Sequence, residues 1–436
     1  MYWMFSFVTE EILAQAAVIS LLVFGVYVGI KLRFFNITKT HAICRSFVQK
    51  KSGGKRLDSI RALTLALAGT LGVGNITGVA SAIVSGGPGA VFWMWVAAIL
   101  SMLIKYCEIV LAVKNRVIIN GESCGGAMYY MKRVVALPFS VLCILASFAI
   151  GNFLQVNAIV ESAHALSDID PAVAGVIISA IVWLAISHGS RGMSSFTLFL
   201  VPIMSLIYVA LSLTIILKNF ASITSVFSLI VRSAFSPSSV VGGIGGYGIM
   251  RSVKYGINRG IVSNEAGCGT APMAYASAND KTPVEQGFWG IFEVFADTII
   301  MCTLTAFVIL LSYEETMGFA DMELVIASFG MSTAPLICSC VILFGIATII
   351  GWSYYGINAT KYLLGERGVR IYTIIFSLSC ILGSILSADA IWTLSDFCIG
   401  GMTLLNLCSM LKYTNVIADD TDRYFGMTVR SRGARK

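Results

Sequence analysis

The sequence predicts an all-α polytopic membrane protein of about 11 transmembrane helices, with two inverted repeats of five helices and one extra N-terminal helix. Three observations lead to this class. Of the 436 residues, 57% are hydrophobic and only 12% are charged, about half the charged share of a soluble domain. Apolar runs of membrane-spanning length recur along the whole chain. Two of these runs are interrupted by glycine-rich stretches, GTLGVGNITG (69–78) and SNEAGCGTAP (263–272).

The individual spans follow from length and hydropathy, since a transmembrane helix needs about 20 mainly apolar residues. The seventh span is the longest and the richest in glycine and charge. Residues 219–235 predict a further short helix at the membrane interface. The expected spans are 12–30, 61–84, 90–112, 134–158, 172–188, 194–217, 240–279, 286–311, 335–358, 371–388 and 391–411.

The two interrupted spans are the second and the seventh, so they lie five helices apart. Because five is odd, units that begin at these spans have opposite orientations in the membrane, as in inverted-repeat transporters. We therefore expect four parts. These are an extra helix with a basic loop (1–60), a first repeat (61–235), a second repeat (236–411) and a basic tail (412–436).

The distribution of lysine and arginine predicts the orientation, because cytoplasmic loops carry the excess of these residues. With the N-terminus outside, the inner segments hold 24 of the 30 Lys and Arg, whereas the outer loops hold only Lys218 and Arg232. We expect a multi-pass protein of the plasma (inner) membrane with a cytoplasmic C-terminus. The net charge of +7 then faces the anionic inner leaflet, so nucleic acid is not an expected partner.

Neither a metal centre nor an enzyme active site is expected, and no cofactor is predicted. The 11 cysteines and 3 histidines do not cluster and lack zinc-ligand spacing. No set of His with Asp, Glu or Ser is expected at one depth in the membrane. The cysteines are interpreted as small buried hydrophobic residues.

The first glycine-rich break is the leading candidate for a binding site. An unwound helix in the membrane frees N–H and C=O groups, which is tolerated only where they line a cavity or bind a ligand. Gly72, Val73 and Gly74 would present amides suited to a carboxylate, while Thr70 and Asn75 add side-chain oxygens. The alternative is a small-residue face for tight helix packing.

The second break contains Glu265, for which two interpretations stay open. An intramembrane carboxylate is a functional candidate by default, but it could also accept hydrogen bonds that fix the unwound backbone. In the third span, Lys105 and Glu108 are spaced i,i+3 and are expected to pair with each other.

The eighth span carries Glu293 and Asp297, which are four residues apart and so expected on one helix face. Asp297 lies near the predicted midplane and is a candidate cation or proton site. The equal alternative is an ion pair with one of four intramembrane cations: Lys105, Arg251, Lys254 or Arg259.

Polar residues in two further apolar spans complete the candidates. Gln155 in the fourth span is the residue best placed to reach a substrate. Thr348 and Trp352 in the ninth span share a face, where they either form a pocket wall or simply pack.

Together these stretches resemble the alanine or glycine:cation symporter family. The resemblance spans roughly residues 10 to 412 and implies sodium-driven uptake of small neutral amino acids, on a fold of ten core helices plus one. The matching text is GTLGVGNITGVASAIVSGGPGAVFWMWVAAILSMLIKYCEIVLAVKNR (69–116), GNFLQVNAI (151–159), RGIVSNEAGCGTAP (259–272), EVFADTIIMCTLTAFVIL (293–310) and GWSYYGINATKYLLG (351–365).

The resemblance also implies roles for particular residues. The amides near Val73 and Gly74 would hold the substrate carboxylate, and Asn75 resembles the asparagine that follows the broken first core helix in related sodium symporters. Sodium would bind the carbonyls near Ala68 and Leu71. The rest of the pocket would consist of Gln155, Val262, Ala266, Trp352 and Thr348, the last of which also faces the sodium ion.

The sequence departs from the family pattern at three positions. Ala347 stands where a serine is expected beside the sodium site, and Ile357 stands where a glutamate is expected. Val262 replaces a residue that is usually aromatic. The first departure puts the coupling ion in doubt, and the third puts the shape of the pocket in doubt.

The sequence therefore favours a symporter that moves sodium and alanine or glycine by alternating access, with one chain as the transport unit. A proton-coupled symporter that uses Asp297 is the alternative. A channel or facilitator would need pore-lining rings or a filter repeat, and the sequence has neither pattern.

Overall fold

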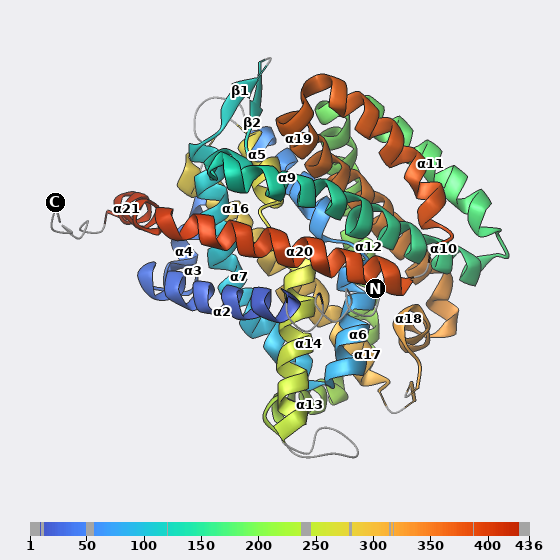
Figure 1. Cartoon of the computed structure of the whole chain (residues 1–436). Helices are drawn as coiled ribbons and strands as arrows, with labels where there is room; N and C mark the ends of the chain where they lie inside the picture. Colours follow the sequence, from blue (N-terminus) through green and yellow to red (C-terminus); the bar gives the residue numbers. More distant parts are fainter. Residues whose placement is uncertain are drawn as a thin grey trace.

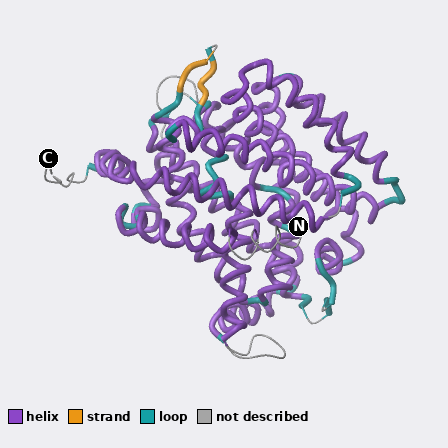
Figure 2. Tube along the Cα trace, viewed as in Figure 1, coloured by secondary structure: helices purple, strands orange, loops and turns teal. Residues whose placement is uncertain are grey.

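The computed structural model describes residues 9, 13–48, 56–119, 121–236, 246–278, 281–313, 315–316, 318–386 and 388–426. The described chain is almost entirely helical, with one short hairpin at one end of the molecule (Figure 2). This confirms the predicted all-α class.

Helices are present in the described part of every expected span; residues 12, 240–245, 279 and 387 of these spans lie outside the described residues. The part expected as the first repeat contains α5 (Arg56–Thr70) and α6 (Thr77–Gly86), α7 (Gly89–Lys114), α9 (Arg133–Phe148) with α10 (Leu154–Leu166), α11 (Pro171–Ser187) and α12 (Gly189–Lys218). It is preceded by α2 (Ala14–Lys31). The second region holds α14 (Gly246–Asn264) and α15 (Ala271–Ala276), α16 (Pro283–Val294) with α17 (Thr303–Leu311), α19 (Ala334–Gly383) and α20 (Ala388–Met410).

Some spans are joined and others are divided. Within α19 the chain turns at Gly365, where φ is +67°, so this element contains two expected spans. Single π-helical segments, Ala149–Phe153 and Phe295–Cys302, join α9 to α10 and α16 to α17. Seven helices of the described residues are long and apolar enough to cross a membrane. Helices α5 and α6 are too short because the first break divides them, whereas α14 has 19 residues but carries Arg251, Lys254 and Arg259.

The remaining elements are short. The expected interfacial helix is α13 (Ile223–Phe235), preceded by the 3₁₀ turn Phe220–Ser222. Further 3₁₀ turns cover Val73–Asn75, Met331–Thr333 and Leu411–Tyr413. The hairpin pairs β1 (Val117–Ile119) with β2 (Glu122–Cys124), a feature the sequence did not predict. The other helices are α3 (Phe35–Thr38), α4 (Thr40–Val48), α8 (Ala127–Tyr130), α18 (Asp321–Phe329) and α21 (Thr414–Tyr424).

Helix α7 lies at the centre of the molecule. It packs against α14, α16, α13 and α15, and 89% of its most apolar window is buried. Helix α19 packs against α9, α10, α11 and α12, while α2 packs on the outside against α7 and α20 (Figure 1). The interrupted helices are therefore enclosed by complete ones, which shields their unpaired backbone groups from lipid.

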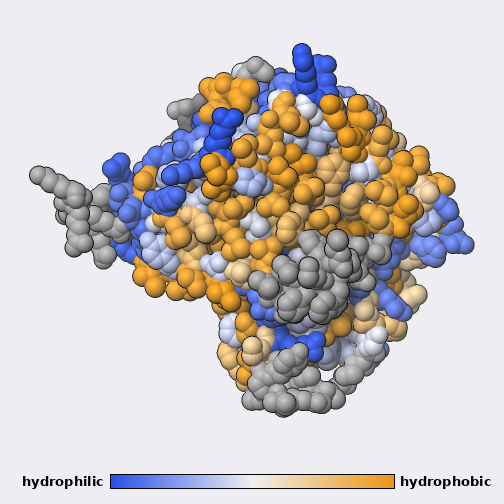
Figure 3. All heavy atoms as spheres, in the orientation of Figure 1, coloured by the Kyte–Doolittle hydropathy of each residue, from blue (hydrophilic) through white to orange (hydrophobic). Residues whose placement is uncertain are grey.

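The outer surface is apolar over a broad region (Figure 3). Leu, Ile, Val and Phe side chains are exposed on α2, α11, α12 and α19. A protein in water rarely exposes so large an apolar surface. Such a surface fits contact with lipid chains, in agreement with a multi-pass membrane protein.

Candidate functional site at two interrupted helices

The first expected break is present. Helix α5 ends at Thr70, a 3₁₀ turn covers Val73–Asn75, and α6 begins at Thr77. Gly72 between them is extended, with φ −129° and ψ −160°. Its N–H donates to the side-chain Oδ1 of Asn75 at 3.0 Å. Asn75 thus closes the turn that separates the two half-helices.

The second expected break lies between α14 and α15. Glu265, Gly267 and Gly269 have φ values of +53°, +87° and +76°. Glycine adopts this left-handed region easily, whereas for a glutamate it is uncommon and costly. Thr270 Oγ1 donates to Glu265 Oε2 at 2.7 Å. This bond favours a carboxylate that fixes the unwound backbone.

The first break, α10 and α19 meet at Gly72. The Val73 N–H donates to Gln155 Oε1 at 3.3 Å, and Thr348 Oγ1 donates to the Leu71 carbonyl at 3.3 Å. A Cβ atom on Gly72 would lie only 2.6 Å from Thr348 Oγ1 and 3.2 Å from Gln155 Oε1. The structure therefore brings together these candidates from three separate helices.

Trp352 lies one turn beyond Thr348 on α19 and is fully buried. Its Cβ lies directly against Gly151 in the π-helical segment of the fourth span, leaving no room for a side chain there. Its ring makes an edge contact with Tyr355 at a centroid distance of 5.5 Å.

Among the described residues, three other candidates near the breaks form no hydrogen bond with α10 or α19. Thr70 and Ala266 form hydrogen bonds within their own segments, and Gly74 has space around it. The Thr70 hydroxyl donates to the Ala66 carbonyl at 3.3 Å, within its own helix. The Ala266 N–H donates to Asn264 Oδ1 at 3.1 Å. A Cβ on Gly74 would find its nearest neighbour, Ser263 Cα, at 3.9 Å. Gly72, rather than Gly74, is therefore the position where a side chain is sterically excluded.

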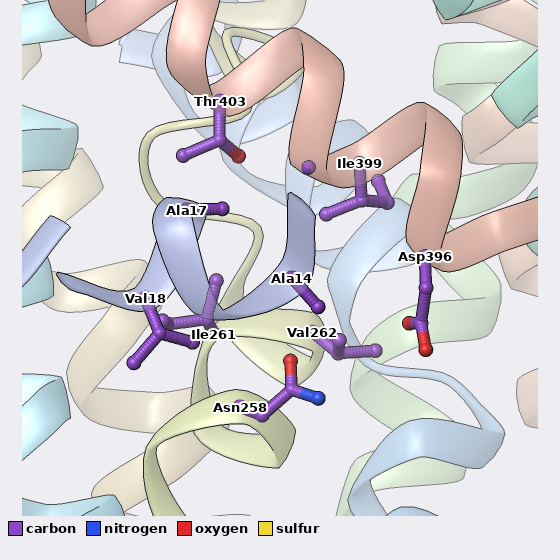
Figure 4. A pocket seen from close by; sticks show the side chains of 10 residues that line it. Ala14, Ala17, Val18, Asn258, Ile261, Val262, Asp396, Ile399 and Thr403 are labelled. Carbon is purple, nitrogen blue, oxygen red and sulfur yellow. The ribbon is translucent and has the colours of Figure 1, made fainter. Parts of the chain in front are cut away.

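Val262 is a buried residue of α14, directly before Ser263. It lines a small hollow of about 20 Å³ between α2, α14 and α20, with Ala14, Asn258 and Ile399 around it (Figure 4).

Ala68 is fully buried where α5 crosses α19. A Cβ on Gly351 would lie 2.5 Å from the Gly69 nitrogen and 2.9 Å from the Ala68 carbonyl carbon. The backbone of α5 just before the break is thus in direct contact with α19. Ala347, also fully buried, offers no side-chain oxygen here.

Asp297 joins the two breaks. It is fully buried in the π-helical segment after α16. Its Oδ1 accepts from Asn75 Nδ2 at 2.7 Å, and its Oδ2 accepts from Ser263 Oγ and Thr298 Oγ1, both at 2.8 Å. Asp297 is therefore held by polar groups, and among the described residues it forms no ion pair with any of the four candidate cations.

Sequence reasoning missed three members of this polar cluster. Ser263 and Thr298 contact Asp297 directly, and Thr305 Oγ1 donates to the Asn75 carbonyl at 2.8 Å. Ser263 stands two residues before Glu265 in the second break. Glu265 was the candidate there because it is the charged residue, and a serine alone is not a distinctive signal. Thr298 and Thr305 had no signal, because single threonines are common in transmembrane helices.

The expected Lys105–Glu108 pair is wrong. Lys105 Nζ lies 3.1 Å from Glu293 Oε1, and both side chains are fully buried. Glu108 Oε1 instead accepts the Gly269 N–H at 2.9 Å and a bond from Asn406 Nδ2. The reason is that α7 packs against several elements, so residues one turn apart on it contact different neighbours.

Glu293 and Asp297 also differ in surroundings, although their i,i+4 spacing predicts one face. Glu293 lies against Lys105 of α7, whereas Asp297 lies against Asn75 and Ser263 at the breaks. The π-helical segment begins at Phe295, between the two residues. Because a π turn holds more residues than an α turn, it changes the direction of the side chains that follow.

Comparison with known proteins agrees with this architecture. The chain is 38% identical to an uncharacterized transporter of Haemophilus influenzae over 92% of this chain and 91% of that protein. It is 34% identical to the sodium/alanine symporter AgcS of Methanococcus maripaludis, over 92% of each chain. A manganese transporter of Eremococcus coleocola, solved as a mutant, superimposes with a TM-score of 0.55 at 12% identity, covering 88% of this chain and 84% of that one.

The structural likeness is one of fold, since only 12% of the residues are identical. The sequence likeness goes further, because it extends through both breaks and all the helices around them. The sodium:alanine symporter family matches residues 1–434. The chain therefore belongs to the sodium:alanine symporter family.

Proposed function

We propose that the protein is a sodium-coupled symporter that takes up small neutral amino acids such as alanine or glycine by alternating access. The observation that carries this proposal is the meeting of the Val73 amide, Gln155 and Thr348 around Gly72. Backbone N–H groups at an interrupted helix suit a carboxylate, and unwound carbonyls suit a sodium ion.

The substrate carboxylate would bind the amides of Val73 and Gly74. The Val73 N–H now donates to Gln155 Oε1, so an incoming carboxylate would take the place of this oxygen. Gln155 would then turn its amide toward the substrate. Trp352 and Ala266 would close the site, and the crowding at Gly72 leaves room only for a small side chain.

Two groups of oxygens would serve sodium. The first consists of the carbonyls near Ala68 and Leu71 together with Thr348 Oγ1, which lies 3.3 Å from the Leu71 carbonyl. The second consists of Asp297 and Asn75, joined at 2.7 Å. Ala347 removes one hydroxyl from the first group, so the charge of Asp297 would matter more for holding the cation.

The orientation supported by the loop charges is N-terminus outside and C-terminus in the cytoplasm, in the plasma membrane. The inner segments hold 24 of the 30 Lys and Arg in that orientation. One chain contains both breaks and all the candidate residues, which supports a monomeric transport unit.

Uptake of labelled alanine into proteoliposomes tests the proposal. An inward sodium gradient should drive accumulation, and unlabelled alanine inside should produce saturable counterflow. Uptake that ignores sodium but follows a pH gradient would replace sodium with protons and give Asp297 the role of proton carrier. Flux without saturation or counterflow would indicate a channel or facilitator. A competition panel of glycine, serine, glutamine and the D-forms would rank the substrates.

A further inference from the structure

A second hollow, unrelated to the site above, lies where α2 ends and meets α21. Its volume is about 550 Å³. Tyr27, Lys31 and Arg33 line it from the end of α2, and Asn415, Asp419 and Asp422 line it from α21. Figure 1 shows α21 at the same edge of the molecule as α3 and α4, which follow α2.

The hollow adjoins an exposed apolar stripe on α2. Four side chains on one face of α2 form an exposed apolar stripe: Ile19, Val23, Val26 and Ile30, with 60%, 64%, 44% and 68% of their surface accessible. This stripe fits contact with lipid chains, and Ile30 at its end also lines the hollow. Tyr27 is an amphipathic residue of the kind enriched at the membrane–water interface.

The hollow presents charges of both signs. Lys31 Nζ donates to Tyr27 OH at 3.0 Å and to Thr414 Oγ1, and both acceptors are neutral. Within the described part of the chain, neither Lys31 nor Asp419 has an ion-pair partner. Arg33 lies 3.7 Å from Asp422, and 47% of its side-chain surface is accessible.

We propose that this hollow binds the head group of a phosphatidylethanolamine molecule from the inner leaflet. The phosphate would lie against Lys31 and Arg33, and the primary ammonium would donate to Asp419 and Asp422. The acyl chains would continue along the apolar stripe of α2. A head group with both charges fits better than a purely anionic one, which would bring a phosphate toward two carboxylates without offering them a positive charge.

The chemistry of the ammonium distinguishes this lipid from its near relatives. A primary ammonium carries three N–H donors, whereas the trimethylammonium of phosphatidylcholine carries none and phosphatidylglycerol has no positive charge. The proposal therefore predicts that phosphatidylethanolamine binds more tightly than either of the other two lipids when the acyl chains are the same.

Native mass spectrometry of the delipidated protein, titrated with each of the three lipids, tests this prediction. We expect about tenfold tighter binding of phosphatidylethanolamine, which corresponds to about 1.4 kcal/mol. Soluble glycerophosphoethanolamine should bind more weakly than the lipid, because it lacks the chains that contact α2. Equal binding of the three lipids, or equal binding of the soluble head group, would overturn the assignment.

Two variants separate the two halves of the head group. Lys31→Met should weaken the binding of all three lipids, since each has a phosphate. Asp419→Asn should lower the affinity for phosphatidylethanolamine toward that for phosphatidylcholine, because only Asp422 is left to face the ammonium, and should leave the affinity for phosphatidylcholine unchanged. Lys132→Met, at an exposed lysine outside the hollow, is the matched control and should bind as wild type. Thermal unfolding without lipid verifies that the variants are folded, and unchanged selectivity in Asp419→Asn would contradict the proposal.

Discussion

At the scale of single residues, Gly72 explains why the first break has to be glycine-rich. A helix-interior glycine costs roughly 1 kcal/mol relative to alanine. Here the absent side chain lets the backbone of the break approach Thr348 and Gln155 closely. The sequence predicted this neighbourhood but did not single out Gly72, because spacing alone does not tell which glycine faces the next helix.

Replacing Gly72 by alanine should weaken alanine binding by about tenfold or more, the equivalent of at least about 1.4 kcal/mol. The added Cβ would lie 2.6 Å from Thr348 Oγ1 and would push apart the groups around the site. Equilibrium binding of labelled alanine to purified protein measures the effect. Gly78→Ala is the control, since a Cβ there meets nothing within 4 Å. Equal affinities for the two variants would contradict this placement of the pocket.

Asp297 is the residue whose charge should matter most for the coupling ion. Asp297→Asn removes the negative charge while keeping the size of the side chain. We expect the sodium concentration for half-maximal alanine uptake to rise by about tenfold or more, because a cation loses a charged ligand. Sodium titration of uptake in proteoliposomes provides the measurement. An unchanged sodium requirement would show that Asp297 serves only to hold Asn75 and Ser263.

At the scale of elements, the sequence predicted the spans well and the side-chain pairings poorly. Hydropathy located the spans because lipid imposes length and polarity on each helix independently. Pairing depends on which neighbours surround a helix, and hydropathy carries no information about those neighbours. Lys105 therefore contacts Glu293 of α16 instead of Glu108, and the π-helical segment after Val294 separates Glu293 from Asp297. Neither π segment has a sequence signal that we could recognise.

The buried Lys105–Glu293 pair should be strongly coupled. Removing one partner leaves an uncompensated charge in a fully buried position, at a cost of about 3–5 kcal/mol. Lys105→Met and Glu293→Gln should each lower the thermal unfolding midpoint in detergent markedly. The double variant should recover much of the loss, because no net charge is left unpaired. Additive losses in the double variant would argue against a direct ion pair.

At the scale of the whole molecule, the two interrupted helices lie inside a shell of continuous ones. The two breaks are linked by hydrogen bonds among Asn75, Ser263 and Asp297. A displacement of one break would therefore alter the contacts of the other. This arrangement fits alternating access, in which half-helices on either side of a central site move relative to a scaffold.

Cys44 provides a native probe of the proposed orientation, because it is an exposed free cysteine in the basic segment after α2. An impermeant maleimide should fail to label it in intact cells and should label it after permeabilisation. Cys44→Ser is the control for labelling at other cysteines. Labelling of Cys44 in intact cells would reverse the proposed topology.

The central claim is that alanine and sodium occupy adjoining places at the first break, and linkage between the two ligands tests it most directly. Equilibrium alanine binding to purified protein should be measured across a sodium titration with choline as the replacement cation, and sodium binding across an alanine titration. We predict that each ligand raises the affinity of the other by the same factor, because coupling free energy is reciprocal. Alanine binding that is equally tight with and without sodium would contradict the account.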